Sequence, residues 1–269
     1  MESNKSINIF SKRYLESILK KKKDSGGGSY LGGIIEEYKY YYKFFEKEYR
    51  NEYFYKNTLF NKIVLGKHSI NTTYALNEVV INKSKADMII VNRNSPIVYE
   101  IKTELDNFDK LEHQIKDYYK ISKLVYVVTA ENTFYPLYRI LKGSNVGIYV
   151  LTRRNTLSLK KKAVENTYLE HKALFKLLRK NEYEKIIMGC FGKIPKVRDF
   201  EYYTACFELF EQIEINEAYT KVYKELEKRD TVYEKKYLSM IPYELRWLVY
   251  TSKFNEASYE ELIDIFYNE

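Results

Sequence analysis

The sequence predicts an α/β protein with a mixed β-sheet core flanked by helices and an all-helical C-terminal extension. Apolar, β-branched runs of strand length recur between residues 76 and 151, and amphipathic stretches of helical period separate them. After Thr152-Arg153-Arg154, the pattern changes to helical periodicity. Strands that alternate with helices favour a sheet covered by helices, and the tail favours a separate helical region.

The composition is typical of a soluble globular protein. The 269 residues are 45% hydrophobic and 30% charged, and a formal net charge of +8 permits a nucleic-acid partner without requiring one. No stretch approaches the roughly 18–20 apolar residues of a membrane span, and the N-terminus lacks the apolar segment of a signal peptide. Cys190 and Cys206 form neither a disulfide framework nor a zinc motif. We therefore expect a cytoplasmic protein with reduced thiols and no membrane contact.

The first 65 residues are expected to be helical, with one linker. Residues 1–20 carry apolar side chains at roughly helical spacing, and residues 34–65 form an aromatic-rich amphipathic pattern of one or two helices that ends at Gly66. Between them, Lys20–Ser29 has the sequence KKKKDSGGGS. This composition predicts a mobile linker, either a basic arm that touches phosphates or a solvated loop.

Three strands are expected next, at residues 76–82, 86–92 and 97–102. The segment RNSP at residues 93–96 fits the turn of a hairpin. The second and third strands should therefore be antiparallel neighbours.

Helices and strands alternate after this hairpin. The expected elements are a helix over 106–122, a strand over 124–129, a helix over 134–141, a strand over 146–151 and four to six helices within 165–269. Asp106 or Asn107 can cap the first of these helices. The expected domains are an N-terminal helix with linker (1–30), a core with the sheet (31–155) and a helical C-terminal region (156–269).

Charged side chains occur inside the second and third expected strands. Asp87 precedes the apolar run MIIV, and Glu100 and Lys102 lie in PIVYEIK, with twelve residues between the two acids. A charge in a buried strand is costly unless it is paired, and the strand period places Glu100 and Lys102 on one face. A divalent cation held by the two carboxylates, with the lysine beside it, would account for all three charges. The alternative is a set of solvated strand-end ion pairs that also includes Lys85.

Spacing alone does not identify this group, because the same spacing occurs a second time. Asp24 is followed, after twelve residues, by Glu37-Tyr38-Lys39. Asp24 lies in the predicted linker, however, and Glu37 lies in a helical pattern. Of these two copies, only the one at 87–102 places both acids in adjacent apolar strands, so the context supplies the specificity.

The segments KADMIIV and PIVYEIK resemble the PD-(D/E)xK signature of the restriction-endonuclease-like nuclease superfamily, with Ala86 in place of the proline. A second match follows on the next predicted helix, where Gln114 and Tyr118 fit the QxxxY motif of RecB-like nucleases and share a helix face. Together with LVYVVT at 124–129, these segments also resemble a poorly characterised bacterial family of stand-alone nucleases within that superfamily. The resemblance covers about residues 55–152 and implies a restriction-endonuclease-like core.

The resemblance also implies a metal-dependent nuclease site. Asp87, Glu100 and the backbone carbonyl of Ile101 would bind Mg²⁺ or Mn²⁺, which are hard ions that prefer oxygen ligands. Lys102 would position or activate the attacking water. The glutamine and tyrosine of QxxxY would orient the lysine, the metal-bound water or the DNA backbone.

Five other residues are weaker candidates. Glu78 and His68 belong either to the metal site or to the surface. Lys85, Arg153 and Arg154 are candidate phosphate contacts, with a solvated turn as the alternative for the two arginines.

These expectations combine into a Mg²⁺- or Mn²⁺-dependent nuclease that hydrolyses phosphodiester bonds, with DNA as the expected substrate and RNA still open. The setting would be phage defence or DNA repair. The alternative is a catalytically idle nucleic-acid-binding or protein-interaction module on the same fold. The helical tail is the candidate surface for a protein partner or a homo-oligomer, by analogy with proteins whose added regions select the substrate.

Overall fold

The computed structural model describes residues 8–24, 33–93, 95–229 and 236–267, and the chain divides into two compact units. One unit joins the two ends of the chain, Met1–Asn71 and Thr231–Glu269, and the other is the continuous segment Thr72–Asp230. This division differs from the predicted domains. Residues before the sheet pack with the C-terminal helices, and the first part of the predicted C-terminal region packs with the sheet.

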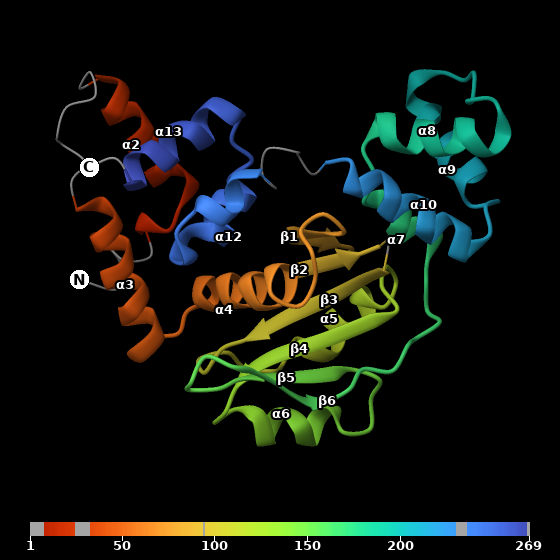
Figure 1. Cartoon of the computed structure of the whole chain (residues 1–269). Helices are drawn as coiled ribbons and strands as arrows, with labels where there is room; N and C mark the ends of the chain where they lie inside the picture. The colour runs from red at the N-terminus through yellow and green to blue at the C-terminus, as the bar shows by residue number, and fades with distance from the viewer. Residues whose placement is uncertain (1–7, 25–32, 94, 230–235, 268–269) are drawn as a thin grey trace. The chain divides into compact units, whose positions relative to one another are not determined.

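The continuous unit is built on a six-stranded sheet in the order β1-β2-β3-β4-β5-β6 (Figure 1). The strands are β1 (Thr73–Ile81), β2 (Ser84–Asn92), β3 (Ser95–Lys102), β4 (Leu124–Ala130), β5 (Gly147–Leu151) and β6 (Leu157–Lys161). Neighbours are antiparallel from β1 to β3, parallel from β3 to β5 and antiparallel between β5 and β6. The predicted mixed sheet and the β2–β3 hairpin are confirmed.

Helices connect the parallel strands and cover one face of this sheet. The helices of the unit are α5 (Leu111–Tyr118), α6 (Phe134–Leu141), α7 (His171–Lys176), α8 (Lys180–Phe191), α9 (Asp199–Phe210) and α10 (Ile215–Glu227). Leu111 of α5 and Leu137 of α6 share one buried cluster with Val98 of β3. Because side chains alternate along a strand, Glu100 and Lys102 lie on the same face as Val98, the face that α5 covers.

The tail helices α7 to α10 complete this core. Tyr223 of α10 links two segments, because its carbonyl accepts a hydrogen bond from the Tyr74 hydroxyl at 2.7 Å and its own hydroxyl donates to the Ile121 carbonyl at 2.8 Å. Phe175 and Phe210 are buried in the same cluster, with ring centroids 5.1 Å apart. The predicted C-terminal helical region is thus confirmed, and its first half supports the sheet.

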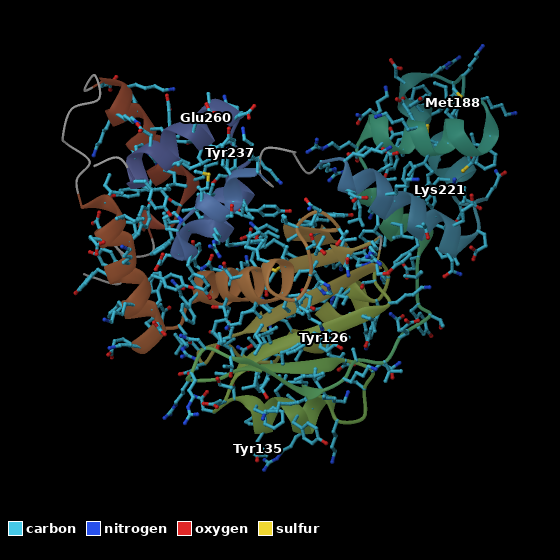
Figure 2. All side chains as sticks on the ribbon, in the orientation of Figure 1. Tyr126, Tyr135, Met188, Lys221, Tyr237 and Glu260 are labelled. Carbon is cyan, nitrogen blue, oxygen red and sulfur yellow. The ribbon has the colours of Figure 1, made fainter. Side chains whose placement is uncertain are left out.

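The second unit is helical in its described residues. It contains α2 (Lys12–Asp24), α3 (Ile34–Lys47), α4 (Glu52–Leu59), the π-helical turn η1 (Phe60–Leu65), the 3₁₀ turns η2 (Leu238–Met240) and η3 (Tyr243–Leu245), α12 (Arg246–Ser252) and α13 (Glu256–Tyr267). The buried Asn57 amide ties the two chain ends together, since it donates to the Tyr243 carbonyl and accepts from the Trp247 backbone N–H, both at 3.0 Å. Tyr237 donates to Glu260 at 2.6 Å (Figure 2).

Three local expectations were wrong. Helix α2 continues through Lys20–Asp24, where a linker was predicted, because lysines form helices well and are favourable in the last turn of a helix. The remainder of the predicted linker, residues 25–29, lies outside the described residues. The helix expected over 106–122 is shorter, because Asp106 accepts hydrogen bonds from Thr103 instead of capping it, and Asn107 accepts one from the Asp109 N–H. Strand β6 was not predicted.

Within the described part of the chain, no helix is long and apolar enough to cross a membrane. Cys190 and Cys206 are free thiols, on α8 and α9 respectively. Burial raises the pKa of the Cys206 thiol above its ordinary value.

Candidate active site

A buried ion pair forms the end of β3. Glu100 is 2% exposed and Lys102 is 9% exposed. The Lys102 Nζ donates to Glu100 Oε1 at 2.8 Å and to Gln114 Oε1 at 3.0 Å. The strand period predicted this pairing, because residues two apart on a strand face the same side.

Helix α5 holds the Glu100 carboxylate from the other side. Gln114 Nε2 donates to Glu100 Oε1 at 2.6 Å, so the Gln114 amide bridges Glu100 and Lys102. The Tyr118 hydroxyl lies 2.6 Å from Glu100 Oε2 and 3.0 Å from the backbone carbonyl oxygen of Lys85. Burial, followed by the negative charge of Glu100, raises the pKa of Tyr118 well above its ordinary value. Tyr118 therefore remains a protonated donor at neutral pH.

Asp87 occupies the point where β2 and β3 separate. The pairing between these strands ends at Met88–Tyr99, and Asp87 Oδ2 accepts the next available N–H, that of Ile101, at 2.7 Å. The N–H and C=O of one strand residue point to the same side in the plane of the sheet. The Ile101 carbonyl therefore points towards β2 and Asp87, as its predicted role as a metal ligand requires.

The donor set fits a hard divalent cation. Asp87, Glu100 and Lys102 together carry one net negative charge. The atoms predicted to bind the metal, on Asp87, Glu100 and the Ile101 carbonyl, are oxygens, which Mg²⁺ and Mn²⁺ prefer. An ionised carboxylate offers about four acceptor positions, and Glu100 uses three for the bonds from Lys102, Gln114 and Tyr118. No group of three or more His, Cys, Asp or Glu residues suited to a metal occurs in the described ranges. The main predicted ligands include two such side chains, Asp87 and Glu100, together with the Ile101 carbonyl, and Glu78 is the additional candidate.

Two threonines that the sequence patterns did not single out support the lysine. Thr129 of β4 pairs in register with Lys102, and its Oγ1 donates to the Lys102 carbonyl at 2.9 Å. The Thr129 hydroxyl also lies 2.7 Å from the Thr133 hydroxyl. The parallel register between β3 and β4 is the signal that would have identified Thr129.

Of the weaker candidates, Glu78 and Lys85 pair with each other across β1 and β2. Glu78 has a positive φ of 51°, and its carboxylate accepts from the Lys85 ammonium at 2.7 Å, where both side chains are about half exposed. Lys85 reaches the site through its backbone carbonyl, which lies next to Tyr118. His68 belongs to the unit formed by the two chain ends, whereas the site belongs to the continuous unit.

Arg153 and Arg154 lie in the exposed turn after β5. In the parallel register, Lys102 aligns with Thr129 and Thr129 aligns with Val150. The turn therefore follows the same edge of the sheet as the site, two strands or roughly 10 Å away from β3. This separation is compatible with a contact to the backbone of a nucleic acid that lies along the edge.

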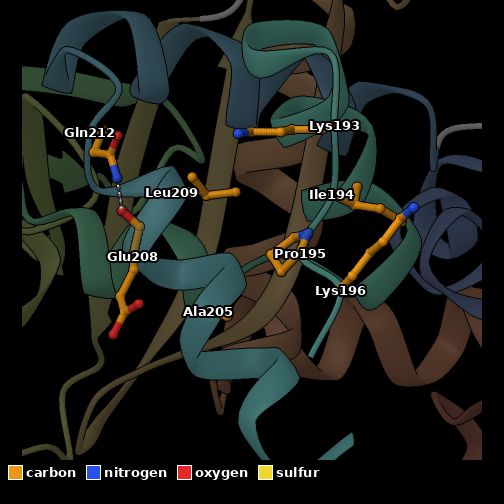
Figure 3. A pocket seen from close by; sticks show the side chains of 8 residues that line it. All are labelled: Lys193, Ile194, Pro195, Lys196, Ala205, Glu208, Leu209 and Gln212. Carbon is orange, nitrogen blue, oxygen red and sulfur yellow. Dashed lines mark hydrogen bonds between the residues drawn. The ribbon is translucent and has the colours of Figure 1, made fainter. Parts of the chain in front are cut away.

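A hollow of about 570 Å³ lies beside α9 (Figure 3). Its lining consists of Lys193, Ile194, Pro195, Lys196, Ala205, Glu208, Leu209 and Gln212. With Glu208 as the one acid among these residues, the hollow lacks paired carboxylates. The network around Glu100 is therefore the better candidate for an active site.

Residues 46–246 match the family model described as bacteriophage P4 protein cII. The chain belongs to the bacteriophage P4 protein cII family. The matched residues include the complete network around Glu100 and Lys102. No curated protein and no solved structure matches the chain. The family description names no reaction, so its function has to be argued from the chemistry of the site.

Proposed function

We propose that this chain is a Mg²⁺- or Mn²⁺-dependent nuclease that hydrolyses phosphodiester bonds in DNA. The observation that carries the proposal is the buried Glu100–Lys102 pair, held by both motif residues of α5 and placed beside Asp87. A buried ion pair of this kind is weak support for stability, because its desolvation offsets much of its attraction. A catalytic use of the charges would account for their presence in the buried end of the strand.

Each side chain has a defined task in this proposal. Asp87, Glu100 and the Ile101 carbonyl would hold the cation. When bound, the cation lowers the pKa of a water ligand and offsets negative charge on the phosphate. Tyr118 fixes one oxygen of Glu100 by hydrogen bonding and so limits the orientations of the carboxylate.

Lys102 would act on the reacting atoms. Its ammonium group has three N–H donors, of which two bind Glu100 and Gln114. We infer that the third donor contacts the attacking water or a phosphate oxygen and stabilises the charge that develops there. Gln114 keeps Lys102 at the site, since its amide oxygen accepts from the ammonium group while its amide nitrogen binds Glu100.

Charge and family membership bear on the substrate and the setting. A net charge of +8 favours a polyanionic partner, and the basic turn at Arg153–Arg154 follows the edge that carries the site. Membership in a family named after a bacteriophage P4 protein fits a role connected with mobile elements, such as phage defence. The two free thiols fit the reducing cytoplasm, where we locate the enzyme.

The alternative is an idle binding module on the same fold. One observation favours it: Lys102 is buried and already bonded to two acceptors, which is also the arrangement of a structural ion pair. In that case the chain would retain DNA without cutting it.

The deciding experiment is a cleavage assay with a matched control. Plasmid, linear and single-stranded DNA and an RNA oligomer are incubated with Mg²⁺, Mn²⁺ or EDTA. We expect cleavage of DNA with either cation and a loss on the order of 10²–10³-fold in Lys102→Ala, the usual cost of one donor to a developing charge. Lys39→Ala, which alters the lysine of the other copy of the spacing, should cleave at the unaltered rate.

Two results would overturn the proposal: no cleavage of any substrate, or equal cleavage by the unaltered chain and Lys102→Ala. Retention of DNA that weakens steeply with salt, without cleavage, would support the binding module.

A further inference from the structure

A second, lysine-lined pocket opens on the flank of α5. Its volume is about 490 Å³. It is lined by Asn82 and Lys83 of the β1–β2 turn, His113 and Asp117 of α5, Lys120 and Glu170 of the adjoining loops, and Lys172 and Lys176 of α7. These elements are close in space, since they line one pocket, although they lie far apart in the sequence. Figure 1 labels α5 and α7.

The two acids of the pocket already have partners. Asp117 is buried and accepts hydrogen bonds from Ser84 at 2.7 Å and Asn82 at 3.3 Å, and its carboxylate lies 3.5 Å from Lys120. Burial alone would raise the pKa of Asp117, but these partners lower it below its ordinary value. Glu170 lies 3.6 Å from the same Lys120 ammonium. Lys120 therefore lies near both acids, and His113 also lies 3.4 Å from the Asp117 carboxylate.

Three lysines of the pocket remain without an acid. Within the described ranges, Lys83, Lys172 and Lys176 form no ion pair. Lys172 and Lys176 lie four residues apart on α7, a spacing at which like charges repel. Lys83 faces the same pocket from the β1–β2 turn. An anion in the pocket would offset this repulsion, and a phosphate group suits a pocket lined by several lysines.

The pocket lies next to the candidate active site. Ser84 precedes Asp87 by three residues on β2, which corresponds to about 10 Å along the strand. On α5, Asp117 directly precedes Tyr118, and His113 directly precedes Gln114.

We propose that this pocket binds backbone phosphates of DNA beside the candidate active site, through Lys83, Lys172 and Lys176. The proposal rests on the proposed nuclease function for the identity of its ligand. The pocket would hold the strand in register while Lys102 and the carboxylates act on the bond. Because lysines contact phosphates as point charges, the pocket would add affinity without sequence preference.

The test measures binding without cleavage. Fluorescently labelled 20-nucleotide single-stranded DNA and its duplex are titrated in EDTA with the unaltered chain, with Lys172→Ala/Lys176→Ala and with Lys142→Ala/Lys185→Ala. The last variant removes the same charge from exposed lysines on other parts of the unit. We expect the pocket variant to bind roughly fivefold to tenfold more weakly and to lower the slope of log affinity against log salt by about 1 to 2. The control variant should retain the slope of the unaltered chain. Circular dichroism melts of all three proteins verify their folding.

The outcomes separate this proposal from the proposed nuclease function. Equal slopes of log affinity against log salt for the pocket and control variants, or no DNA binding by the unaltered chain, would overturn the proposal that the pocket binds phosphates. Loss of DNA binding in the pocket variant, together with no cleavage in the assay with metal, would support phosphate binding by the pocket and refute the proposed nuclease activity. If the unaltered chain cleaves DNA and the pocket variant has a lower salt slope, both the nuclease activity and phosphate binding by the pocket are supported.

Discussion

The same spacing of acid, acid and lysine occurs in two regions with different structures. In the strand copy, formed by Asp87, Glu100 and Lys102, the last two residues are buried side by side. In the helix copy, formed by Asp24, Glu37 and Lys39, the aspartate ends α2 and the other two residues lie on α3. There, Lys39 is exposed and donates to Glu36 instead of Glu37.

The difference follows from the periods of the two elements. Residues two apart share a face of a strand, but on an α-helix they point in nearly opposite directions. A motif of the form ExK therefore brings its acid and its lysine together only in a strand. The sequence spacing is the same in both regions, and the backbone conformation decides in which of them the acid and the lysine meet.

The largest expected effect is on stability when the lysine of the strand copy is removed. Lys102→Ala leaves Glu100 buried without its cationic partner, and breaking a buried pair in this way typically costs 3–5 kcal/mol, as an order of magnitude. Since Gln114 and Tyr118 still bind Glu100, we expect a loss of about 3 kcal/mol in the free energy of unfolding. Urea denaturation in EDTA measures it.

The matched variant of the helix copy is Lys39→Ala. Its ion pair with Glu36 is solvent-exposed, with 49% and 69% of the two side chains accessible, and such pairs contribute about 0–1 kcal/mol. We expect a loss below about 0.5 kcal/mol. Equal losses in the two variants would show that burial does not distinguish the copies.

Metal binding provides the second comparison. A cation that binds only the folded chain, present at a concentration 100 times its dissociation constant, increases the free energy of unfolding by about 2.7 kcal/mol. This increase raises the melting temperature by roughly 5–10 °C. We expect Mg²⁺ or Mn²⁺ to produce this shift in the unaltered chain and in Asp24→Asn. Asp87→Asn should lose it, because an amide is a weaker ligand than a carboxylate.

Differential scanning fluorimetry with and without EDTA provides the measurement. A shift that persists in Asp87→Asn would place the cation elsewhere in the chain. A shift lost equally in Asp24→Asn would mean that the strand copy has no special role.

The strands that hold the site could be predicted because they are apolar and β-branched. The runs MIIV and PIVYEIK are buried within the sheet, and the short polar turn between them permits only an antiparallel pairing. Strand β6 has the sequence LSLKK and is at most half-buried. Its pairing with β5 is a tertiary contact at an edge of the sheet, so the local pattern did not reveal it.

The sequence predicted which side chains share a face, but not which faces meet. The strand period places Glu100 and Lys102 on one face, and helix spacing does the same for Gln114 and Tyr118, whereas the contacts of Glu100 with α5 are tertiary and were not predicted. The bond from the Ile101 N–H to Asp87 depends on where the β2–β3 pairing ends, and a sequence does not specify this. Asp117 of the lysine-lined pocket lies within the motif stretch, but the Asn82 and Ser84 side chains that donate hydrogen bonds to it are distant in the sequence.

The smallest effect concerns a hydroxyl group bound to the acid in each copy. In the strand copy Tyr118 lies 2.6 Å from Glu100, and in the helix copy the Tyr14 hydroxyl donates to Glu37 at 3.1 Å. Hydrogen bonds to charged groups are worth about 1.5–3 kcal/mol when buried. We expect Tyr118→Phe to cost about 2 kcal/mol at pH 7 and the part-exposed Tyr14→Phe to cost well under 1 kcal/mol.

Alkaline pH sharpens this last comparison. Burial, with the neighbouring Glu100, holds the pKa of Tyr118 far above the value of about 10 that an unfolded tyrosine has. Between these two values only the unfolded chain releases the proton, so the stabilisation by Tyr118 is complete below about pH 10 and declines as pH rises above it. The difference in stability between the unaltered chain and Tyr118→Phe should therefore narrow above about pH 10. Burial and Glu37 raise the pKa of Tyr14 to about 12. The difference in stability between the unaltered chain and Tyr14→Phe, which is smaller at pH 7, should therefore also narrow above about pH 10. Urea denaturation from pH 7 to 11 tests both variants. A stability difference between the unaltered chain and Tyr118→Phe that is small at pH 7, or that widens as pH rises, would contradict a buried hydroxyl–carboxylate bond at the site.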